Sequence, residues 1–234
     1  MIKHYYWPTP NGHKTAIMLE EVGIEYEVHA IDILNGKQFD PDFIKISPNN
    51  RIPAIVDTDG PEGKPYSVFE SGAILLYLAE KTGKLWPKTT RERYEVMQWL
   101  MFQMGNVGPM FGQNGYFQGY CPEDVPLAKE RYHNVTKQLY GVLDKRLANS
   151  AYLAGDDYSI ADIATFPWTM PKQQNMHRID GNEYPNVKRW GEEIATRPAV
   201  QRGIAQLADD MKVGNPSEET YKNMFGSEQF KGVD

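Results

Sequence analysis

The residues best suited to chemistry in this sequence gather in short segments at the junctions of expected strands and helices. Residues 8–14, PTPNGHK, form a run of turn-forming residues between a first strand and a first helix. This run is either a structural cap for the helix or part of a binding site. Residues 69–73, FESGA, join a strand to a helix, and Ser71 lies where backbone N–H groups and the positive helix end can bind a carboxylate.

Two further segments predict a specific local backbone structure. Pro53 comes just before an expected strand, where a cis peptide bond, although found in only about 5% of X-Pro bonds, usually shapes a site. A cis Ile52–Pro53 bond would turn the Ile52 backbone outward, so that its N–H and C=O can pair with an extended ligand as an added strand does. Residues 159–162, SIAD, have the form of a capping box, and we interpret Asp162 as holding a helix start rather than as a catalytic acid.

The composition excludes several classes of protein. The chain has 234 residues, a formal net charge of −6 and a single cysteine, Cys121, which cannot form an internal disulfide. Its five histidines are scattered without a cysteine cluster, so no metal site is expected. The longest apolar run, residues 73–79, is too short to span a bilayer, and the first residues are unlike a signal peptide. Because long basic runs are absent too, we expect a soluble cytoplasmic protein with no metal, membrane or nucleic-acid partner.

Hydrophobic periodicity divides the chain near residue 88. Before that point the pattern predicts, in the order βαβαββα, strands at 2–6, 26–31, 54–57 and 67–69 and helices at 14–22, 41–46 and 71–82. A β-α-β start gives a parallel pair of strands, and the later ββ step gives an antiparallel edge. After residue 87 the pattern predicts helices at 91–105, 126–149, 160–168 and 187–196.

Two domains follow from this pattern: an α/β domain at residues 1–85 and an all-helical domain at residues 91–234, joined by a linker at 86–90. Glycines between residues 105 and 119 are expected to bend or interrupt the helix that enters them. The aromatic segment 111–120 is either core or the lining of a pocket for a second substrate. The polar stretch from Gly214 is expected to lie on the surface as a tail.

Taken together, these segments resemble the cytosolic glutathione transferases over essentially the whole chain. Pro53 matches the family's cis-proline, Glu70 and Ser71 match its γ-glutamyl-binding pair, and residues 159–162 match its capping box. The resemblance implies a thioredoxin-like N-terminal domain followed by an all-α domain. More narrowly, four runs are similar to the bacterial Nu class and its fungal nitrogen-regulator relatives: TPNGHK at 9–14, SPNN at 47–50, FESGAILLYL at 69–78 and GPMFGQN at 108–114.

The resemblance also implies which residues bind glutathione, a tripeptide with two carboxylates, an ammonium and a thiol. Ser71 takes the γ-glutamyl carboxylate through its hydroxyl and backbone N–H, and Glu70 pairs with the ammonium in a charge-assisted contact. The Ile52 backbone, turned outward by Pro53, pairs with the cysteinyl segment. The candidates for the glycine carboxylate are Arg51 and Gln38.

Many family members stabilise the glutathione thiolate with a Tyr, Ser or Cys near the end of the first strand. Here the loop holds no cysteine, and the Nu-class resemblance implies that Thr9 and Asn11 donate hydrogen bonds to the sulfur, aided by the N-terminus of the first helix. An activating tyrosine, Tyr5 or Tyr6, is the competing interpretation, although tyrosines in this strand are more often packing groups. We interpret Cys121, far in sequence from these motifs, as an incidental cysteine.

The implied function is that of a glutathione-dependent transferase or oxidoreductase. In the Nu class the favoured activity is disulfide-bond reduction, with two glutathione molecules or one glutathione disulfide bound. Conjugation of electrophiles and peroxide reduction are alternatives, and a non-catalytic binding or regulatory module is the alternative of a different class. The expected partners are a small hydrophobic or disulfide second substrate and a second copy of the chain in a homodimer, where Gln103 or Asn106 would reach the neighbouring ligand.

Overall fold

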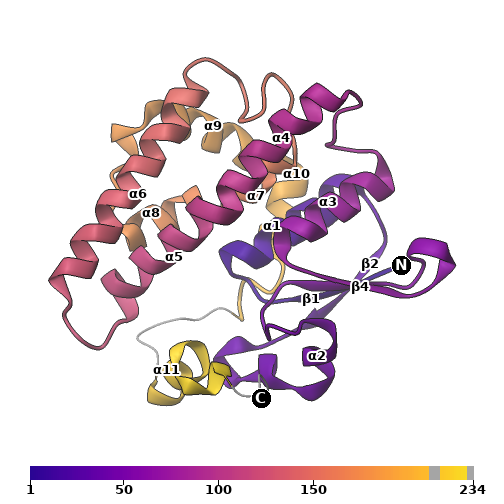
Figure 1. Cartoon of the computed structure of the whole chain (residues 1–234), viewed down its shortest axis with the longest axis horizontal. Helices are drawn as coiled ribbons and strands as arrows, with labels where there is room; N and C mark the ends of the chain where they lie inside the picture. Colours follow the sequence, from indigo (N-terminus) through magenta and orange to yellow (C-terminus); the bar gives the residue numbers. More distant parts are fainter. Residues whose placement is uncertain (211–216, 231–234) are drawn as a thin grey trace. The chain divides into compact units, whose positions relative to one another are not determined.

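Figure 1 shows the computed structural model of the chain, which describes residues 1–210 and 217–230. These residues form two compact units, one made of Met1–Tyr77 together with the segment from Arg202 onward, the other of Leu78–Gln201. The first unit holds a β-sheet with helices and the second is helical, which confirms the predicted thioredoxin-like domain followed by an all-helical domain. Within the described residues, no helix has both the length and the apolar character needed to cross a membrane.

The sheet of the first unit has four strands in the spatial order β2-β1-β3-β4. β1 (Ile2–Tyr6) pairs in parallel with β2 (Tyr26–Ala30), and β3 (Ala54–Asp57) pairs antiparallel with β1 on its other side. β4 (Tyr66–Phe69) completes the sheet as an antiparallel edge beside β3. The predicted parallel start and antiparallel edge are confirmed, and the strand bounds differ from the prediction only in that β2 ends and β4 begins one residue earlier.

Three α-helices accompany these strands: α1 (Pro10–Val22), α2 (Pro41–Ile46) and α3 (Ser71–Thr82). The bounds of α2 and α3 match the prediction, but α1 begins four residues earlier than predicted. Thr9 is its N-cap, because the Thr9 Oγ1 accepts the Gly12 N–H at 3.2 Å. Pro10 takes the first helical position, where its missing N–H costs nothing. Much of the expected loop at 8–14 is therefore the first turn of α1.

Short helices fill the connections of the first unit. Two 3-10 helices, η1 (Ile33–Asn35) and η2 (Lys37–Phe39), lie between β2 and α2, and a third, η3 (Pro61–Gly63), lies between β3 and β4. The turn between η1 and η2 passes through Gly36, which has a φ of 74° in the left-handed region that glycine tolerates.

The C-terminal segment, residues 217–230, corrects the expectation of a plain surface tail. It forms α11 (Glu218–Phe225) and the 3-10 helix η7 (Ser227–Phe230), and α11 packs against η1. The side-chain amide of Asn223 donates to the main-chain oxygen of Leu34 at 3.0 Å. Residues 214–216 and 231–234 of the expected tail lie outside the described residues.

The second unit is built from α-helices and two π-helical segments. Four helices agree with prediction to within three residues at each end: α4 (Thr90–Phe102), α6 (Pro126–Leu147), α7 (Ile160–Thr169) and α9 (Pro185–Ala195). α8 (Pro171–His177) and α10 (Pro198–Ala205), each opened by a proline, were not predicted; α10 continues into the first unit. A short 3-10 helix, η6 (Gly181–Glu183), precedes α9.

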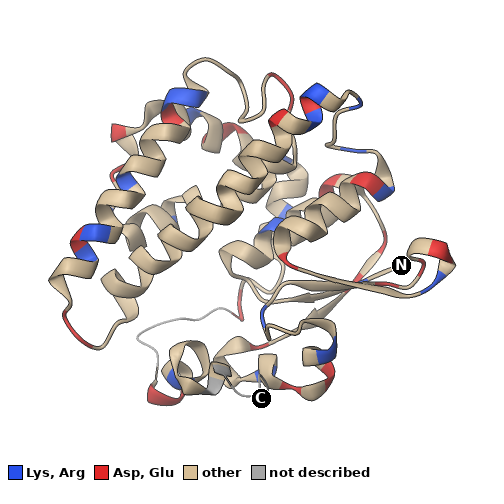
Figure 2. Cartoon of the chain, viewed as in Figure 1, with Lys and Arg blue, Asp and Glu red and all other residues tan. Residues whose placement is uncertain are grey.

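The glycine-rich stretch interrupts the α-helical pattern without ending the helix. α5 (Gly108–Gly115) lies between the π-helical segments η4 (Gln103–Val107) and η5 (Tyr116–Tyr120). In Figure 2, α5 carries no charged residue whereas α6 carries both signs. The α5 ring of Phe111 is fully buried and stacks on Tyr140 at 5.0 Å, which confirms the core interpretation for this one residue of the aromatic segment.

Asp162 has the structural role that its capping-box spacing predicted. Its carboxylate accepts the N–H groups of Leu153 and Ser159 at 2.9 and 3.0 Å and the indole N–H of Trp190 at 2.9 Å. Burial raises the pKa of Asp162 to about 6, although these hydrogen bonds act in the opposite direction. The residue is fully buried, so it serves as an internal anchor that joins α7 to α9.

Candidate functional site

The start of α3 has the features of an anion-binding position. Ser71 is its first residue, directly after the β4 edge strand, and is only 4% exposed. Glu70, just before it, is exposed and has a φ of 68°, a left-handed conformation that is uncommon for a residue other than glycine. Such a conformation beside a helix N-terminus points to a functional constraint. The predicted pair for the γ-glutamyl group therefore occupies one helix end.

Lys14, which the sequence reasoning did not single out, contacts Ser71. Its Nζ donates to Ser71 Oγ at 3.2 Å, and the lysine is 1% exposed. Burial lowers the pKa of Lys14 to about 7, while the nearby Glu70 carboxylate raises it. One signal for this position was present in the sequence, because Lys14 lies three and four residues before Ile17 and Met18, on the same face of α1.

The segment that leads into β3 has the expected backbone. The peptide bond between Ile52 and Pro53 is cis. The Ile52 side chain packs against the buried cluster of Ile31, Phe43 and Ala54, which fixes the segment to the sheet. Among the residues that the structure describes, none forms a hydrogen bond with the Ile52 main chain. Within residues 1–210 and 217–230, the main-chain groups predicted to pair with the cysteinyl part of the ligand therefore make no hydrogen bond.

Gln38 and Arg51, predicted for the glycine carboxylate, both contact the C-terminal segment. Gln38 is 5% exposed, and its Nε2 donates to the main-chain oxygen of Asn223 at 2.9 Å. The Arg51 guanidinium donates to the side-chain oxygen of Gln229, and the neighbouring Asn50 donates to the Gln229 main-chain oxygen at 3.3 Å. The polar side chains of both predicted residues are therefore hydrogen-bonded to the C-terminal segment.

The first turn of α1 holds Thr9 and Asn11, which are both half-buried. Thr9 caps the helix, so one of the two interpretations of this run is confirmed, yet its hydroxyl hydrogen can still be donated. Gly12 permits the tight turn because a Cβ there would lie 2.1 Å from the main-chain oxygen of Trp7. The predicted hydrogen bonds from Thr9 and Asn11 to a ligand sulfur stay a prediction.

The two tyrosines of β1 point to opposite faces of the sheet. Tyr6 is fully buried, and its hydroxyl contacts His13 Nδ1 at 3.1 Å and the Gln206 main-chain oxygen at 3.3 Å. Burial also raises the pKa of Tyr6 well above its ordinary value. Tyr5 instead stacks on His29, with ring centroids 4.9 Å apart. Both residues pack within the first unit, which supports the packing interpretation.

The remaining predicted residues lie in the second unit. Gln103 begins η4 and is fully buried, whereas Asn106 in the same turn is exposed. Their predicted reach to a neighbouring ligand stays a prediction. Cys121 follows η5, is half-buried and forms no disulfide.

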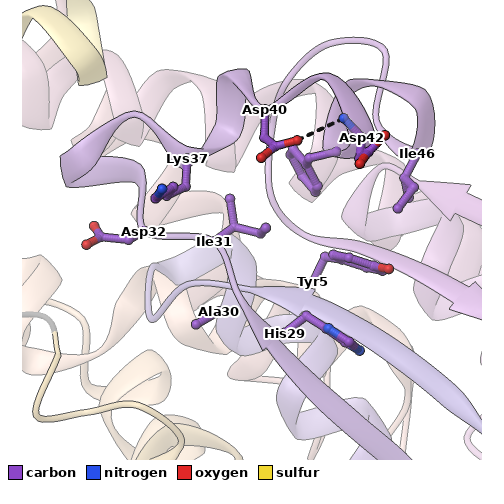
Figure 3. Close-up of a pocket in the computed structure, with 10 residues that line it drawn as sticks. Tyr5, His29, Ala30, Ile31, Asp32, Lys37, Asp40, Asp42 and Ile46 are labelled. Carbon is purple, nitrogen blue, oxygen red and sulfur yellow. Dashed lines mark hydrogen bonds between the residues drawn. The ribbon is translucent and has the colours of Figure 1, made fainter.

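A cavity of about 480 Å³ lies between the end of β2, η2 and α2 (Figure 3). Its lining includes the stacked rings of Tyr5 and His29, together with Asp32, Lys37 and Asp40. Asp40 caps α2 by accepting the Asp42 N–H at 2.9 Å. None of the residues predicted to bind glutathione lines this cavity. It is separate from the predicted site, and the sequence reasoning did not find it.

A thioredoxin-like sheet followed by a helical domain, with a cis-proline before β3 and a serine at the start of α3, defines the class of glutathione transferases. Two family models match the chain: the glutathione S-transferase N-terminal domain over residues 1–80 and the C-terminal domain over residues 116–198. The chain belongs to the glutathione S-transferase family.

Within this family, the chain is similar to several particular members. The chain is 52% identical over 215 residues to the disulfide-bond oxidoreductase YfcG of Escherichia coli, which covers 90% of this chain and 98% of that protein. A Pseudomonas fluorescens glutathione transferase family member with two glutathione bound matches at 47% identity and a TM-score of 0.84, over 87% of this chain and 92% of its own. A Pseudomonas putida glutathione transferase with one glutathione disulfide bound per subunit matches at 44% identity and a TM-score of 0.84, over 87% and 90%.

The described residues include no group of three or more His, Cys, Asp or Glu placed to hold a metal ion.

Proposed function

We propose that this protein catalyses glutathione-dependent reduction of disulfide bonds. The observation that carries the proposal is the 52% identity with a disulfide-bond oxidoreductase over 98% of that protein's length. The two bound forms in the solved relatives, paired glutathione and glutathione disulfide, are the reduced and oxidised states of one thiol–disulfide couple. The single cysteine, Cys121, lies outside residues 1–80, so the sulfur chemistry is assigned to glutathione.

The reaction balances with two glutathione molecules and no protein thiol. The first glutathione thiolate attacks one sulfur of the substrate disulfide, which forms a mixed disulfide and releases the other sulfur as a thiolate that takes up a proton. The second glutathione thiolate attacks the glutathione sulfur of the mixed disulfide. This step forms glutathione disulfide and releases the second substrate thiol, so two electrons pass from two glutathione thiols to the substrate.

The residues predicted in the first unit divide the binding and activation of glutathione between them. Ser71 and Glu70 hold the γ-glutamyl group, and the Ile52 main chain beside Pro53 aligns the cysteinyl segment. Arg51 and Gln38 lie toward the glycine end. Thr9 and Asn11, in the first turn of α1, stabilise the thiolate through hydrogen bonds and the positive helix end.

A glutathione-coupled assay that compares a small disulfide with a chlorinated aromatic electrophile tests the proposal. We expect the disulfide to be reduced with the higher kcat/KM, and glutathione disulfide to form in equal molar amount to the disulfide consumed. Turnover of the electrophile alone would make the protein a conjugating transferase. If wild-type protein turns over neither substrate but binds glutathione, the non-catalytic module is the correct alternative.

A homodimer is the proposed assembly, with a small hydrophobic or disulfide compound as second substrate and the cytoplasm as location. Support for the homodimer comes from large apolar side chains at the surface, which often mark protein–protein interfaces. Tyr66 and Phe69 on the edge strand β4 are 49% and 40% exposed, and Tyr94 and Met101 on α4 are 65% and 47% exposed. Sedimentation at micromolar concentration is expected to give twice the mass of one chain, and a monomer alone would contradict the assembly.

A further inference from the structure

The C-terminal segment, residues 217–230, lies outside both family-model matches, which cover residues 1–80 and 116–198. Its contacts with the first unit are therefore not part of the pattern that those models describe. In Figure 1 its helix α11 lies beside the connection between β2 and α2. One further contact of this segment, between Gln229 of η7 and Arg51, falls directly before the cis peptide bond between Ile52 and Pro53.

The contact between Arg51 and Gln229 has a direction that chemistry fixes. A guanidinium has only donor hydrogens, so the side-chain oxygen of Gln229, Oε1, is the acceptor. The main-chain oxygen of Gln229 accepts from the Asn50 side chain at 3.3 Å, and the main-chain oxygen of Arg51 accepts from the Ser47 hydroxyl at 2.7 Å. The main chain and the side chain of Arg51 are thus held by two separate contacts.

The charge of Arg51 has no acidic partner in the part of the chain that the structure describes. None of the ion pairs within residues 1–210 and 217–230 includes Arg51, which is exposed. Among the same residues, only the neutral amide of Gln229 accepts from its guanidinium, and the buried Nε2 of Gln229 has no acceptor. This pair of side chains has donors in excess, and a planar guanidinium matches the geometry of a carboxylate.

Of the two residues predicted for the glycine carboxylate, Arg51 is the better match. Gln38 donates through Nε2 to the main-chain oxygen of Asn223, so its Oε1 lies at the other end of the amide, buried and without a donor among the described residues. An amide oxygen repels a carboxylate and accepts only from a donor such as a peptide N–H. Every hydrogen-bonding group of the Arg51 side chain is instead a donor.

We propose that Gln229 is a positioning residue for glutathione, which acts through Arg51 on the glycine carboxylate and makes the C-terminal segment a specificity element of the site. By accepting from the guanidinium, Gln229 restricts the long Arg51 side chain and lowers the entropy cost of ordering it when the ligand binds. Because its amide is neutral, Gln229 does this without offsetting the charge that attracts the carboxylate. This inference rests on the proposed function, because it takes the ligand beside Ile52 and Pro53 to be glutathione.

Calorimetry with two ligands tests this role. The ligands are glutathione and glutathione amide, which is identical except that a carboxamide replaces the glycine carboxylate. Wild-type protein should bind glutathione about tenfold or more tightly than the amide, the range for a hydrogen bond to a charged group. Gln229→Ala removes the acceptor for Arg51 but keeps the main-chain oxygen that Asn50 uses. Its affinity should therefore fall about three- to tenfold for glutathione and less than about twofold for the amide.

Two results with Gln229→Ala would overturn the proposal. Equal losses for both ligands would mean that the C-terminal segment has a purely structural role. Tighter binding of glutathione would mean that Gln229 competes with the ligand for Arg51, so that the contact is autoinhibitory.

Three further variants sharpen the test. Gln229→Glu keeps the side-chain size and gives Arg51 an ionic partner, so it should weaken glutathione more than Gln229→Ala does, and it replaces that variant if the alanine protein does not fold. In an Arg51→Met background, Gln229→Ala should change glutathione affinity less than about twofold, because its effect passes through Arg51. Glu219→Ala, at an exposed position of α11, should leave both affinities unchanged.

Kinetics provide a second readout. With a small disulfide, Gln229→Ala should raise the KM for glutathione and leave kcat at saturating glutathione within about twofold, because the glycine carboxylate takes no part in thiol–disulfide exchange. Failure of the proposed function would look different, since wild-type protein would then discriminate between the two ligands yet reduce no disulfide. Equal affinity of an active wild-type protein for glutathione and its amide would refute this inference alone.

Discussion

The side-chain amide of Gln38 donates to the main-chain oxygen of Asn223 at 2.9 Å, which joins residues 185 positions apart in the sequence. Asn223 in turn donates to Leu34 at 3.0 Å, so α11 is held on the turn between η1 and η2. Gln38, one of the two residues predicted for the glycine carboxylate, is therefore tied to the C-terminal segment. A substitution in α11 should therefore disturb the hydrogen bond of the Gln38 side chain.

The first prediction concerns this attachment. Asn223→Ala leaves the Leu34 main-chain oxygen without its donor, at a cost of about 1 kcal/mol for a half-exposed hydrogen bond. Cleavage by trypsin after Lys222, inside α11, requires the helix to open locally, so it should proceed about fivefold faster in this variant. Glu219→Ala, on an exposed position of the same helix, should be cleaved at the wild-type rate. Equal rates for wild type and Asn223→Ala would mean that the contact does not hold α11.

The second prediction tests the γ-glutamyl pair. Glu70→Gln keeps the side-chain size at a position with a φ of 68°, whereas Glu70→Ala leaves only a methyl group. We expect Glu70→Gln to weaken glutathione binding by about 1.5–3 kcal/mol, the cost of losing a charged partner for the ligand ammonium. Ser71→Ala removes the hydroxyl but leaves the helix N–H groups, so its effect should be smaller. Titration calorimetry that gave wild-type affinity for both variants would remove the γ-glutamyl site from this helix end.

The third prediction is that Asp162 stabilises the fold and does not take part in glutathione binding. Asp162→Ala leaves the donors of Leu153, Ser159 and Trp190 buried without their acceptor. The free energy of unfolding should fall by about 3 kcal/mol or more, as expected for several unpaired buried donors. Urea unfolding measures this loss. Asp162→Asn retains one acceptor oxygen and should lose less, and the folded fraction of each variant should bind glutathione with wild-type affinity.

Sequence patterns predicted the elements whose ends carry explicit signals. β1, β3, α2 and α3 have the predicted bounds because turn formers, prolines and a terminal glycine flank them. The predicted start of α1 is four residues too late because PTPNGHK has the composition of a loop, although threonine before proline is also a helix-start signal. α8 and α10 were not predicted because each is at most eight residues long, which is too short to show a clear hydrophobic period of 3.6 residues.

The local backbone of the candidate site was predictable from the sequence, and its tertiary contacts were not. Ser71, Glu70 and Pro53 stand at element junctions that the sequence marks directly. The burial of Lys14 goes against the rule that charged residues face water, so its spacing from the buried Ile17 and Met18 is a weak signal for it. The contact of Gln229 with Arg51 joins distant parts of the chain, and a single sequence holds no record of such a pairing.

The fourth prediction concerns acid. His4 is fully buried with its Nε2 2.7 Å from Thr15 Oγ1, and burial lowers its pKa to about 3, with His29 adding a smaller effect. In the unfolded chain a histidine titrates near pH 6.5. Between these values the unfolded chain binds a proton that the folded His4 does not, so the free energy of unfolding falls as pH falls below 6.5.

Burial also lowers the pKa of His177, to about 4, so this residue too lowers the free energy of unfolding as the pH falls. Urea unfolding between pH 7 and 5 should therefore show stability decreasing toward acid. In His4→Gln, which has no titrating ring, the slope should be shallower by up to about 1.4 kcal/mol per pH unit. An unchanged slope in His4→Gln would show that His4 takes up a proton in the folded protein.

The last prediction concerns the thiolate. If Asn11 donates to the glutathione sulfur, Asn11→Ala should raise the pKa of the bound thiol and slow disulfide reduction about 10- to 1000-fold, the range for losing one stabilising donor. Thr9 is a less clean test because it also caps α1 through its contact with the Gly12 N–H. Asn11 is the second residue of the helix, and its amide can donate to a sulfur anion directly.

Two control variants separate this mechanism from its competitors. Tyr6→Phe keeps the buried ring and loses only the contacts to His13 and Gln206, so its rate should stay near wild type. Cys121→Ser should also be mild, because the attacking thiolate belongs to glutathione. The measurement is the pH–rate profile of all three variants with one small disulfide substrate. Collapse of activity in Cys121→Ser alone would assign the redox sulfur to the protein, and collapse in Tyr6→Phe alone would make the enzyme tyrosine-activated. A profile displaced to higher pH only in Asn11→Ala is the outcome that the thiolate mechanism requires, since a raised thiol pKa moves the active thiolate form to more alkaline conditions.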